Sequence, residues 1–422
     1  MDARLALDGG TPVAAEPLRP VWPRVTVDLE KRLIAQAHTA LSIYDNSGVV
    51  ADFEEAFRAY VGAARALATS SGTAALHSIY YAAGFGPGDE VICCDYGFFI
   101  TAAPLVHLGA RPVFVDCERD GTISVAEVEQ AITPRTRAIV ATHMWGQPAR
   151  MRELRRVCDR SGILLLEDCS HAHGARIGGD VVGSHGDAAA WSLQARKTLW
   201  AGEGGILCTR HDDIYERALL LGHFNARALQ DIAPSSPNHR YAFTGVGLKY
   251  RAHPLAMALA LPQIGTLDQL IEGRQLAASA MIAAFHDVAG MEVLSQSSHD
   301  IIHGYYALVV LVDPAKCGFD REHFLRAMRA ENIWYTEIPG QMGTMSDHAL
   351  FADLDPGRDA DGAFETSRRI TATAVKFFVP AVGIDYPDAD NVVKLITEAI
   401  HKVGHLLPTH ARVGYGTDGA SY

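Results

Sequence analysis

The sequence predicts an α/β protein built around a largely parallel sheet. Between residues 66 and 207, short apolar segments rich in Val, Ile and Leu alternate with amphipathic stretches. Segments that are apolar throughout are typical of strands covered on both faces, and strands that alternate with helices form parallel sheets with helices on both sides. The predicted strands are EVICC (90–94), RPVFVD (111–116), RAIVATHMW (137–145), GILLLED (162–168), AAAWSL (188–193) and GGILCT (204–209).

Helical patterns separate these strands. SVAEVEQAI (124–132) and ARMRELRRVCDRSG (149–162) are predicted helices, and Gly162 has the position of a C-cap. The pattern changes after about residue 245. Residues 254–288 are expected to form one long helix or two, broken by Pro262 and Gly265. The remaining predicted elements are a strand over 305–312, a helix over 320–332 and a closing helix over 391–407.

These patterns predict two domains. A chain of 422 residues exceeds what one hydrophobic core usually serves. We expect a large domain over 1–250 with an N-terminal arm over about 1–35, a connecting helical segment over 251–290, and a small α+β domain over 291–422. The tail from Thr409 has few apolar residues and is expected to be mobile.

Composition disfavours several classes of protein. The chain is 48% hydrophobic and 20% charged, as in ordinary soluble proteins, and its net charge of −12 disfavours binding to nucleic acid or to acidic membranes. No signal peptide or apolar run of about 18 residues indicates a membrane segment. The seven cysteines lack metal-binding spacing, so we expect reduced thiols in a cytoplasmic protein without a metal.

Two segments carry polar groups where predicted strands end, which is where parallel sheets bind ligands. In ATSSGTAALHS (68–78), Gly72 and Thr73 begin a helical run that could hold a phosphate on its free N–H groups; an ordinary Ser/Thr helix cap is the alternative. Asp168 ends an apolar strand, and a buried carboxylate there requires a cationic partner or a capping role. Asp168 with His171 and His173 also suggests a metal site, but no further ligand supports it.

Two further segments carry an aromatic pair and a lysine. Phe98 and Phe99 follow the strand over 90–94, where core packing and ring stacking explain them equally well. Lys197 follows a strand, with Ser192 before it and glycines after it. This arrangement suits an imine-forming amine beside a phosphate, whereas a surface lysine near a glycine turn is the alternative.

Together, the four segments favour one cofactor. A phosphate cradle, a ring stacker, a carboxylate that pairs with a pyridinium and an imine-forming lysine are the separate requirements of pyridoxal 5′-phosphate (PLP). They occur in the chain order Gly72, Phe98, Asp168, Lys197.

The chain also resembles a known family, the sugar aminotransferases of the DegT/DnrJ/EryC1/StrS type within the fold-type I PLP-dependent enzymes. The resemblance begins at LDGGTPV (7–13) and extends through most of the sequence. The motifs that carry it are SGTAAL (71–76), GPGDEVI (86–92), GARPVFVD (109–116), THMWGQPARM (142–151), EDCSHAHGA (167–175) and KTLWAGEGG (197–205).

The resemblance implies a role for each matching residue. Lys197 forms the Schiff base with PLP, Asp168 pairs with the pyridine nitrogen, and Phe98 and Ser170 lie against the two ring faces. His171, where the family often has Gln, reaches the phenolic oxygen of the ring.

The phosphate contacts implied by the resemblance include one departure. Gly72, Thr73 and Ser192 hold the phosphate from within the chain. The family commonly has an Asn-Tyr-Arg triplet that reaches the phosphate of the partner subunit, whereas this chain has Lys249 in place of the asparagine. Lysine can neutralise phosphate, but as a flexible point charge.

The resemblance therefore implies a homodimeric PLP-dependent aminotransferase with shared active sites. The amino donor is glutamate or glutamine, and the acceptor is a keto-sugar or keto-cyclitol. The alternatives are an enzyme of an aminoshikimate or aminobenzoate pathway, a sugar-deoxygenating relative in which histidine replaces the lysine, and a non-enzymatic regulator. Lys197 disfavours the second, and the acidic charge disfavours the third. The candidates for contacts to the acceptor are Tyr335, His303 and His348. For each of them, the alternative is a polar loop residue with no role in binding.

Overall fold

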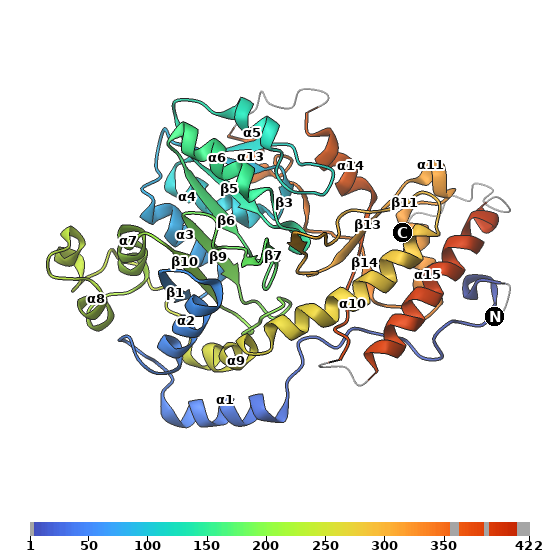
Figure 1. The fold of residues 1–422 in the computed structure, drawn as a ribbon, viewed down its shortest axis with the longest axis horizontal. Coiled ribbons are helices and arrows are strands. Elements are labelled where there is room, and N and C mark those ends of the chain that lie inside the picture. Colours follow the sequence, from blue (N-terminus) through green and yellow to red (C-terminus); the bar gives the residue numbers. More distant parts are fainter. Residues whose placement is uncertain (1–3, 355–362, 384–387, 412–422) are drawn as a thin grey trace.

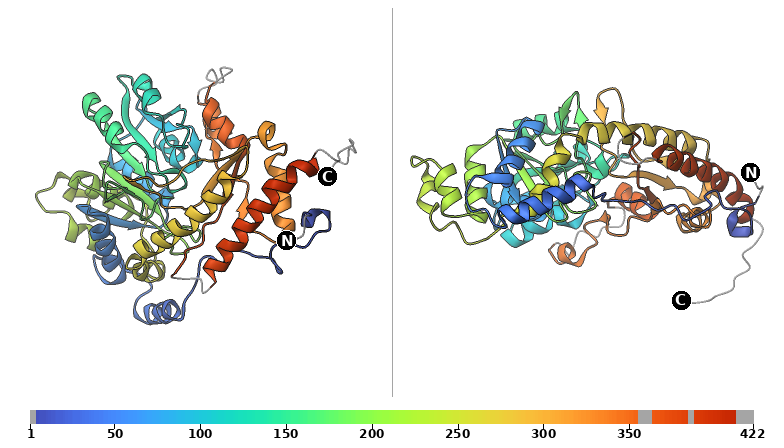
Figure 2. Two further views of the ribbon diagram at one scale, coloured as in Figure 1. Left: turned by 45° about the vertical axis from the view of Figure 1, so that its right-hand side comes forward. Right: turned by 90° about the horizontal axis from the view of Figure 1, so that it is seen from below.

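The computed structural model describes residues 4–354, 363–383 and 388–411. The chain forms two units that lie end to end, a larger one around a seven-stranded sheet and a smaller one around a four-stranded sheet (Figures 1 and 2). Helix α10 (Leu267–His286) runs from the larger unit into the smaller one (Figure 1). The predicted domain boundaries stay a prediction.

The larger sheet confirms the mostly parallel arrangement expected from the sequence. Its strand order is β1-β10-β9-β6-β5-β2-β4, and β10 is antiparallel to both of its neighbours. Strand β1 does not appear among the predicted strands because its sequence, RALAT, contains no Val, Ile or aromatic residue. The bounds are β1 (Arg65–Thr69), β2 (Glu90–Cys94), β4 (Arg111–Val115), β5 (Thr136–Thr142), β6 (Leu164–Asp168), β9 (Ala188–Ser192) and β10 (Gly205–Thr209).

Helices cover both faces of this sheet because successive strand residues point to opposite sides. In β2, Ile92 and Cys94 join the core beneath α2, α6 and α9, whereas Val91 and Cys93 join the core beneath α3, α4 and α7. Gly162 ends α6 in the left-handed conformation (φ 66°), as its predicted C-cap role requires. The bounds are α2 (Gly48–Val61), α3 (Gly72–Ala82), α4 (Ala103–Leu108), α5 (Val125–Ala131), α6 (Met151–Ser161), α7 (Asp212–Gly222), α8 (Ala226–Asp231) and α9 (Pro254–Ile264).

The predicted break within 254–288 is correct at one position and wrong at the other. The chain leaves the helical path at Gly265 and Thr266, between α9 and α10. Pro262 lies inside α9, which continues to Ile264. A proline removes one hydrogen bond and crowds the preceding turn, but α9 tolerates this loss for the two residues that follow Pro262.

The smaller unit packs α10, α12 (Arg321–Ala330) and α15 (Ala389–Ala411) around an antiparallel sheet. The strand predicted over 305–312 begins only at Leu308, because Tyr305 has a positive φ of 42° that a strand does not allow. The closing helix continues to Ala411, beyond the predicted start of the tail; residues 412–422 of that tail lie outside the described residues. The sheet has the order β11 (Met291–Val293), β13 (Leu308–Val312), β16 (Ala374–Phe377) and β14 (Thr336–Glu337).

The N-terminal arm crosses from the smaller unit to the larger one. Buried Glu331 accepts hydrogen bonds from the backbone N–H groups of Ala6 and Val13 and from Lys402, which fixes the start of the arm on the smaller unit. Helix α1 (Val27–Thr39) then packs against α9 along the side of the molecule (Figure 2, right).

Among the described residues, no helix is both long and apolar enough to cross a membrane.

Short elements complete the fold. The short elements are η1 (Ala6–Asp8), β3 (Tyr96–Gly97), η2 (Phe99–Thr101), η3 (Met144–Gly146), β7 (Arg176–Ile177), β8 (Asp180–Val181), η4 (Pro237–Tyr241), β12 (Ile301–Ile302), α11 (Pro314–Cys317), β15 (Gly343–Thr344), α13 (Ala349–Ala352) and α14 (Glu365–Thr373).

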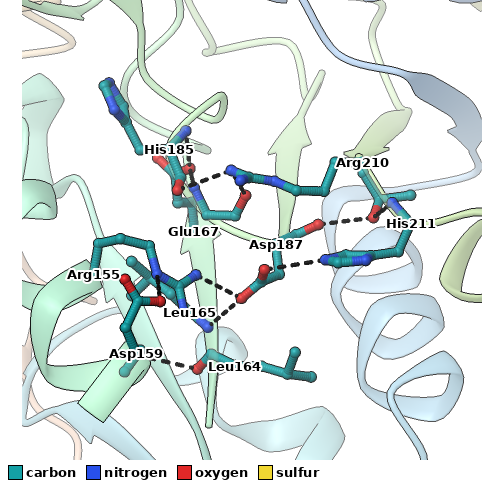
Figure 3. Close-up of polar contacts among 12 residues, drawn as sticks. Arg155, Asp159, Leu164, Leu165, Glu167, His185, Asp187, Arg210 and His211 are labelled. Atoms are coloured by element: carbon teal, nitrogen blue, oxygen red, sulfur yellow. Dashed lines mark hydrogen bonds and ion pairs between the residues drawn. The ribbon is translucent and has the colours of Figure 1, made fainter. Parts of the chain in front are cut away.

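The amino ends of β6 and β9 are held together by a polar network around Asp187 (Figure 3). One carboxylate oxygen accepts from the Leu165 N–H and from Arg155, both at 2.8 Å, and the other lies 3.1 Å from His211. The network fixes the register of the central strands at the edge opposite the cavity described below.

Candidate active site

A cavity of about 690 Å³ opens at the carboxyl edge of the larger sheet. Its walls come from the ends of β5, β6 and β9, from the start of α3, and from loops of both units. The sequence suggests eight residues of one chain as cofactor contacts, and all eight line this cavity. They are Gly72, Thr73, Phe98, Asp168, Ser170, His171, Ser192 and Lys197. Segments that are far apart in the sequence therefore meet in one site.

The start of α3 forms one wall of the cavity. Ser71 caps the helix, since its hydroxyl accepts the Ala74 N–H at 3.0 Å, so the cap interpretation is correct for this residue. The N–H groups of Gly72 and Thr73 occupy the first turn, where no helical carbonyl can accept them. A Cβ at position 72 would lie 2.8 Å from the Ser192 Cβ, so only glycine allows this close approach. The result is a tight, concave site for an anion at a helix N-terminus.

The carboxylate of Asp168 is buried and held in a fixed orientation. Its Oδ2 accepts the Thr101 hydroxyl at 2.6 Å, and its Oδ1 accepts the Ser170 N–H at 3.1 Å. The chain continues from Asp168 through turns rather than into a helix, so Asp168 does not cap one. With these two donors among the described residues, the carboxylate can still pair with a cation in the cavity.

Lys197 lies in the loop between β9 and β10. Its backbone carbonyl accepts the indole N–H of Trp22 at 3.1 Å, and its Nζ lies 4.8 Å from the centre of the Tyr306 ring. Burial lowers the pKa of the amine most; Asp168 opposes this effect and Lys376 adds to it, giving a value of about 8. About a tenth of this amine is therefore neutral, and nucleophilic, at pH 7, far more than for an amine with the usual pKa.

An aromatic stack supports the histidine that faces the cavity. The His171 ring lies 4.1 Å from Tyr306 at an interplanar angle of 8°, with Trp145 at 5.5 Å. Its Nδ1 is buried without a hydrogen-bond partner among the described residues. Burial, with the nearby charge of Lys197, keeps the pKa of His171 well below its usual value, so the imidazole is neutral and one nitrogen is available to a ligand.

The structure places the other candidate residues outside this cavity. His303 is buried, and its two ring nitrogens bond to Ser295 and to the Tyr305 N–H, so we propose no substrate role for it. His348 is exposed, with its ring 5.5 Å from that of Phe99. Tyr335 is buried and lines a neighbouring cavity.

Lys249 is exposed and does not line the cavity of its own chain. Its Nζ lies 5.6 Å from the centre of the Phe224 ring. The next residue, Tyr250, accepts the Ser70 N–H through its carbonyl, so this segment runs beside the strand that leads into the α3 cradle.

Several residues of the site are absent from the sequence prediction. Thr101 orients Asp168, Trp22 holds the Lys197 loop, and Tyr306 and Lys376 line the cavity from the smaller unit. Arg196 also lines the cavity, and its position next to Lys197 is the one signal in the sequence that could have identified it. The others approach only through the tertiary fold.

One cluster of possible metal ligands lies within the described part of the chain, formed by His143, Glu167 and Cys169. Both ring nitrogens of His143 are already used, one by the Glu167 carboxylate and one by the Ala149 N–H. Backbone N–H groups of the loop before β9 also bond to Glu167. We therefore interpret the cluster as a structural network.

The fold and the cavity together define a fold-type I PLP-dependent transferase. Comparison with known proteins identifies the family: the model of the DegT/DnrJ/EryC1/StrS aminotransferase family matches residues 30–357, and the chain belongs to this family. An L-glutamine:2-deoxy-scyllo-inosose aminotransferase from Streptomyces kanamyceticus is 34% identical over 338 residues, covering 78% of each chain.

Solved structures agree in fold. An aminotransferase from Psychrobacter cryohalolentis matches with a TM-score of 0.81 at 23% identity, covering 92% of this chain and 98% of that one. A protein from Streptococcus pneumoniae in its PLP-form matches with a TM-score of 0.77 at 18% identity, covering 92% of this chain and all of that one. The protein is thus a PLP-dependent aminotransferase.

The residues present fit this cofactor on structural grounds. The cradle beside Gly72 is too tight for any side chain at that position and exposes N–H groups suited to a phosphate. The unpartnered Nδ1 of His171 can bond to a ring oxygen, and Asp168 can pair with a protonated ring nitrogen. The amine of Lys197 completes the set of contacts that PLP requires.

Proposed function

We propose that the protein transfers an amino group from glutamate or glutamine to the ketone of a sugar or cyclitol. The observation that carries this proposal is the partly neutral amine of Lys197, which shares one cavity with the Asp168 carboxylate and the α3 cradle. The relative from S. kanamyceticus, named for transfer from L-glutamine to a keto-cyclitol, supports the donor and the acceptor class.

Each residue has a separate role in this proposal. When bound, PLP supplies an electron sink that stabilises negative charge on the α-carbon of the donor. Asp168, oriented by Thr101, holds the proton on the ring nitrogen that makes the sink effective. Lys197 Nζ accepts the proton from the α-carbon; its lowered pKa of about 8 leaves more of the amine unprotonated, and so able to act as a base at neutral pH, than the usual amine value would. The N–H groups of Gly72 and Thr73, with Ser192, hold the phosphate.

The proposal includes a homodimer. Large apolar side chains are exposed on the N-terminal arm and α1 and on the segment after α8, with 69% of Phe243 accessible. Soluble monomers rarely expose a large contiguous apolar patch, so a second copy of the chain is a suitable cover for this surface. The exposed residues between positions 21 and 44 are Val21, Val25, Val27, Ile34, Leu41 and Tyr44, and those from α8 to position 248 are Leu229, Tyr241, Phe243, Val246 and Leu248. Lys249 borders this surface and would approach the phosphate of the partner's cofactor.

A substrate screen tests the function. Protein loaded with the amino form of the cofactor is mixed with keto-sugars and keto-cyclitols, and return of the aldehyde form is followed by absorbance. We expect return with at least one acceptor and a matching amino product by mass spectrometry, and no turnover for Lys197→Ala. Absence of the donor reaction with both glutamate and glutamine would contradict the proposal.

A further inference from the structure

One segment of the smaller unit crosses back to the larger unit at the active-site cavity. It starts after β14, which pairs with β16, and it runs through β15, which pairs with β3 of the larger unit. Between these two pairings, residues 338–342 all line the active-site cavity. We name residues 338–346 the strap. Because β3 ends directly before Phe98, the far end of the strap is fixed beside another wall of the same cavity.

Asp95 of the larger unit binds the far end of the strap. Its backbone carbonyl accepts the Met345 N–H at 2.7 Å, and its carboxylate Oδ1 accepts the Ser346 N–H at 2.9 Å. The side chain of Met345 is buried in the core beneath α3, α4 and α7. The strap is therefore closed in this structure, and one carboxylate contributes directly to holding it closed.

The Asp95 carboxylate is only partly satisfied by these contacts. Asp95 is fully buried, and neither its Oδ2 nor the buried Ser346 Oγ has a hydrogen-bond partner among the described residues. Burial raises the pKa of Asp95 to about 6; the N–H and the nearby hydroxyl of Ser346 oppose this effect, and Asp347 and Asp116 add to it. A buried carboxylate with an unpaired oxygen costs free energy when it is charged, so the closed strap favours the protonated form.

The neighbouring carboxylates do not relieve this cost. Asp347, which follows the strap, pairs with Arg368 at 3.1 Å. Burial alone would raise the pKa of Asp116, but hydrogen bonds from Ser367 and from neighbouring backbone N–H groups outweigh it and lower the pKa. Asp116 therefore stays charged near pH 6 and repels a charge on Asp95.

The groups adjacent to Asp95 in the chain are neutral at this pH. The neighbouring Cys117 thiol, together with burial, raises the pKa of Cys94 well above its usual value. Burial likewise raises the pKa of the Tyr96 phenol. Near pH 6, the change in charge at this end of the strap thus falls on Asp95.

We propose that Asp95 is a positioning residue that holds the strap over the cavity and loosens it when its carboxylate is ionised. When the strap lifts from β3, water reaches the carboxylate and stabilises its charged form. The closed state is favoured in acid, and the open state gains as pH rises toward neutrality. The inference rests on the proposed function for what enters the cavity, whereas the motion itself does not depend on the identity of the donor or acceptor.

The size of the effect follows from the linkage between charge and closing. The pKa of Asp95 is about 6 in the closed state, whereas a solvated aspartate has a pKa of about 3.9. A pKa that is raised on closing contributes stability that is fully present below the open-state value and is lost as pH rises through the closed-state value. The open fraction of the strap should therefore rise about tenfold between about pH 5 and pH 7.5.

Residue-resolved hydrogen exchange on the PLP-loaded protein measures this opening. The reporters are the N–H groups of Met345 and Ser346, and their protection is corrected for the intrinsic exchange rate at each pH. We expect both to be less protected than the N–H groups of β13 in the core of the smaller unit, because the strap opens without global unfolding. Their protection should fall about tenfold from about pH 5 to pH 7.5.

Two variants separate the charge of Asp95 from its structural contact. Asp95→Asn keeps an oxygen that can accept the Ser346 N–H and stays neutral, so protection should remain at its acidic level across this pH range. Asp95→Ala removes the acceptor, so protection should be low at both ends of the range. A purely structural contact would give the same protection at both pH values in the wild type.

Two control variants exclude other titrating groups. Asp313→Asn changes a carboxylate of the smaller unit that pairs with Lys316, and it should keep the pH dependence of the wild type. His348→Gln should keep it too, although histidine commonly titrates in this range. The inference is overturned if the strap is as protected as β13 at every pH, if the wild-type profile is flat, if the pH dependence persists in Asp95→Asn, or if it disappears in His348→Gln.

The donor half-reaction separates this inference from the proposed function. If glutamate or glutamine converts the cofactor while the protection of the strap does not change with pH, the inference is wrong and the proposed function stands. If the strap follows the expected profile but neither donor reacts, the proposed function is wrong and the role of Asp95 in holding the strap stands.

Discussion

The two edges of the larger sheet use the same types of side chain for opposite purposes. At the amino edge, the carboxylate of Asp187 accepts from the Leu165 N–H, Arg155 and His211, and its backbone carbonyl accepts the Thr209 hydroxyl (Figure 3). Burial alone would raise the pKa of this carboxyl, but the hydrogen bonds from Leu165, Arg155 and His211 outweigh it and lower the pKa. This edge is a completed network that stabilises the fold.

The carboxyl edge is electrostatically incomplete. Asp168 accepts only one hydrogen bond on each oxygen, and His171 has a buried nitrogen without a partner among the described residues. Lys197 has no salt bridge within the described chain. Buried polar groups without partners cost stability, so a fold retains them where a ligand supplies the missing contacts. The comparison therefore predicts that substitutions at the carboxyl edge affect catalysis, whereas substitutions at the amino edge affect the stability of the fold.

The largest expected effect follows from removing the amine of Lys197. Lys197→Ala should abolish amino transfer and leave the unfolding midpoint in urea within a small margin of the wild type, because the loop keeps its backbone bond to Trp22. In the wild type, reduction with borohydride and peptide mapping should place the cofactor on Lys197. Label on any other lysine would contradict the assignment.

The substitution Asp168→Asn should have the second-largest effect on catalysis. The amide cannot stabilise a protonated ring nitrogen, so we expect turnover to fall by about 10²–10³-fold, as for other losses of transition-state charge stabilisation. The free energy of unfolding should change little, because an amide oxygen can still accept the Thr101 hydroxyl. Stopped-flow measurement of the donor half-reaction checks this result. Near-normal turnover would mean that Asp168 has only a structural role.

Asp187→Ala tests the amino edge. Loss of the carboxylate removes one acceptor from Arg155 and the side-chain acceptor of His211 and of the Leu165 N–H, so we expect a loss of about 2–4 kcal/mol in the free energy of unfolding. Because folding lowers the pKa of Asp187, its contribution is present above the unfolded-state pKa and is lost as pH falls through the folded-state value. Urea titrations of wild type and variant should therefore converge at acidic pH.

The sequence predicts the carboxyl edge well because local rules apply there. Apolar strands that end in Asp168 or precede Lys197, and a glycine that starts a helix, place chemistry at one edge whatever the rest of the fold does. The contacts that complete the site depend on distant segments. Trp22 lies 175 residues before Lys197, and Thr101 lies 67 residues before Asp168, so no local pattern reports either contact.

The side of the site proposed for the acceptor is the part that the sequence predicts least well. Tyr306 falls within a segment that reads as a strand, but the positive φ of Tyr305 breaks the strand and lets Tyr306 contact Lys197. His303 reads as a free polar side chain, yet its two nitrogens bond inside the protein. Polarity in a loop sequence cannot show whether a group faces a ligand or its own backbone.

The smallest expected effect concerns Lys376, which lines the cavity with Lys197. Burial and the charge of Lys376 both lower the pKa of Lys197, to about 8. Lys376→Gln removes that charge and frees the carboxylate of Glu337, so the pKa of Lys197 should rise. Less neutral amine is then present at pH 7, and cofactor-free protein should form its linkage to added PLP more slowly, by about tenfold if the pKa of the amine rises by about one.

The rate of linkage, measured across neutral and alkaline pH, should keep its plateau and move its midpoint upward. Lys316→Gln, an exposed lysine paired with Asp313 in the smaller unit, is the control. An unchanged midpoint in Lys376→Gln would show that the charge of Lys376 does not lower the pKa of Lys197.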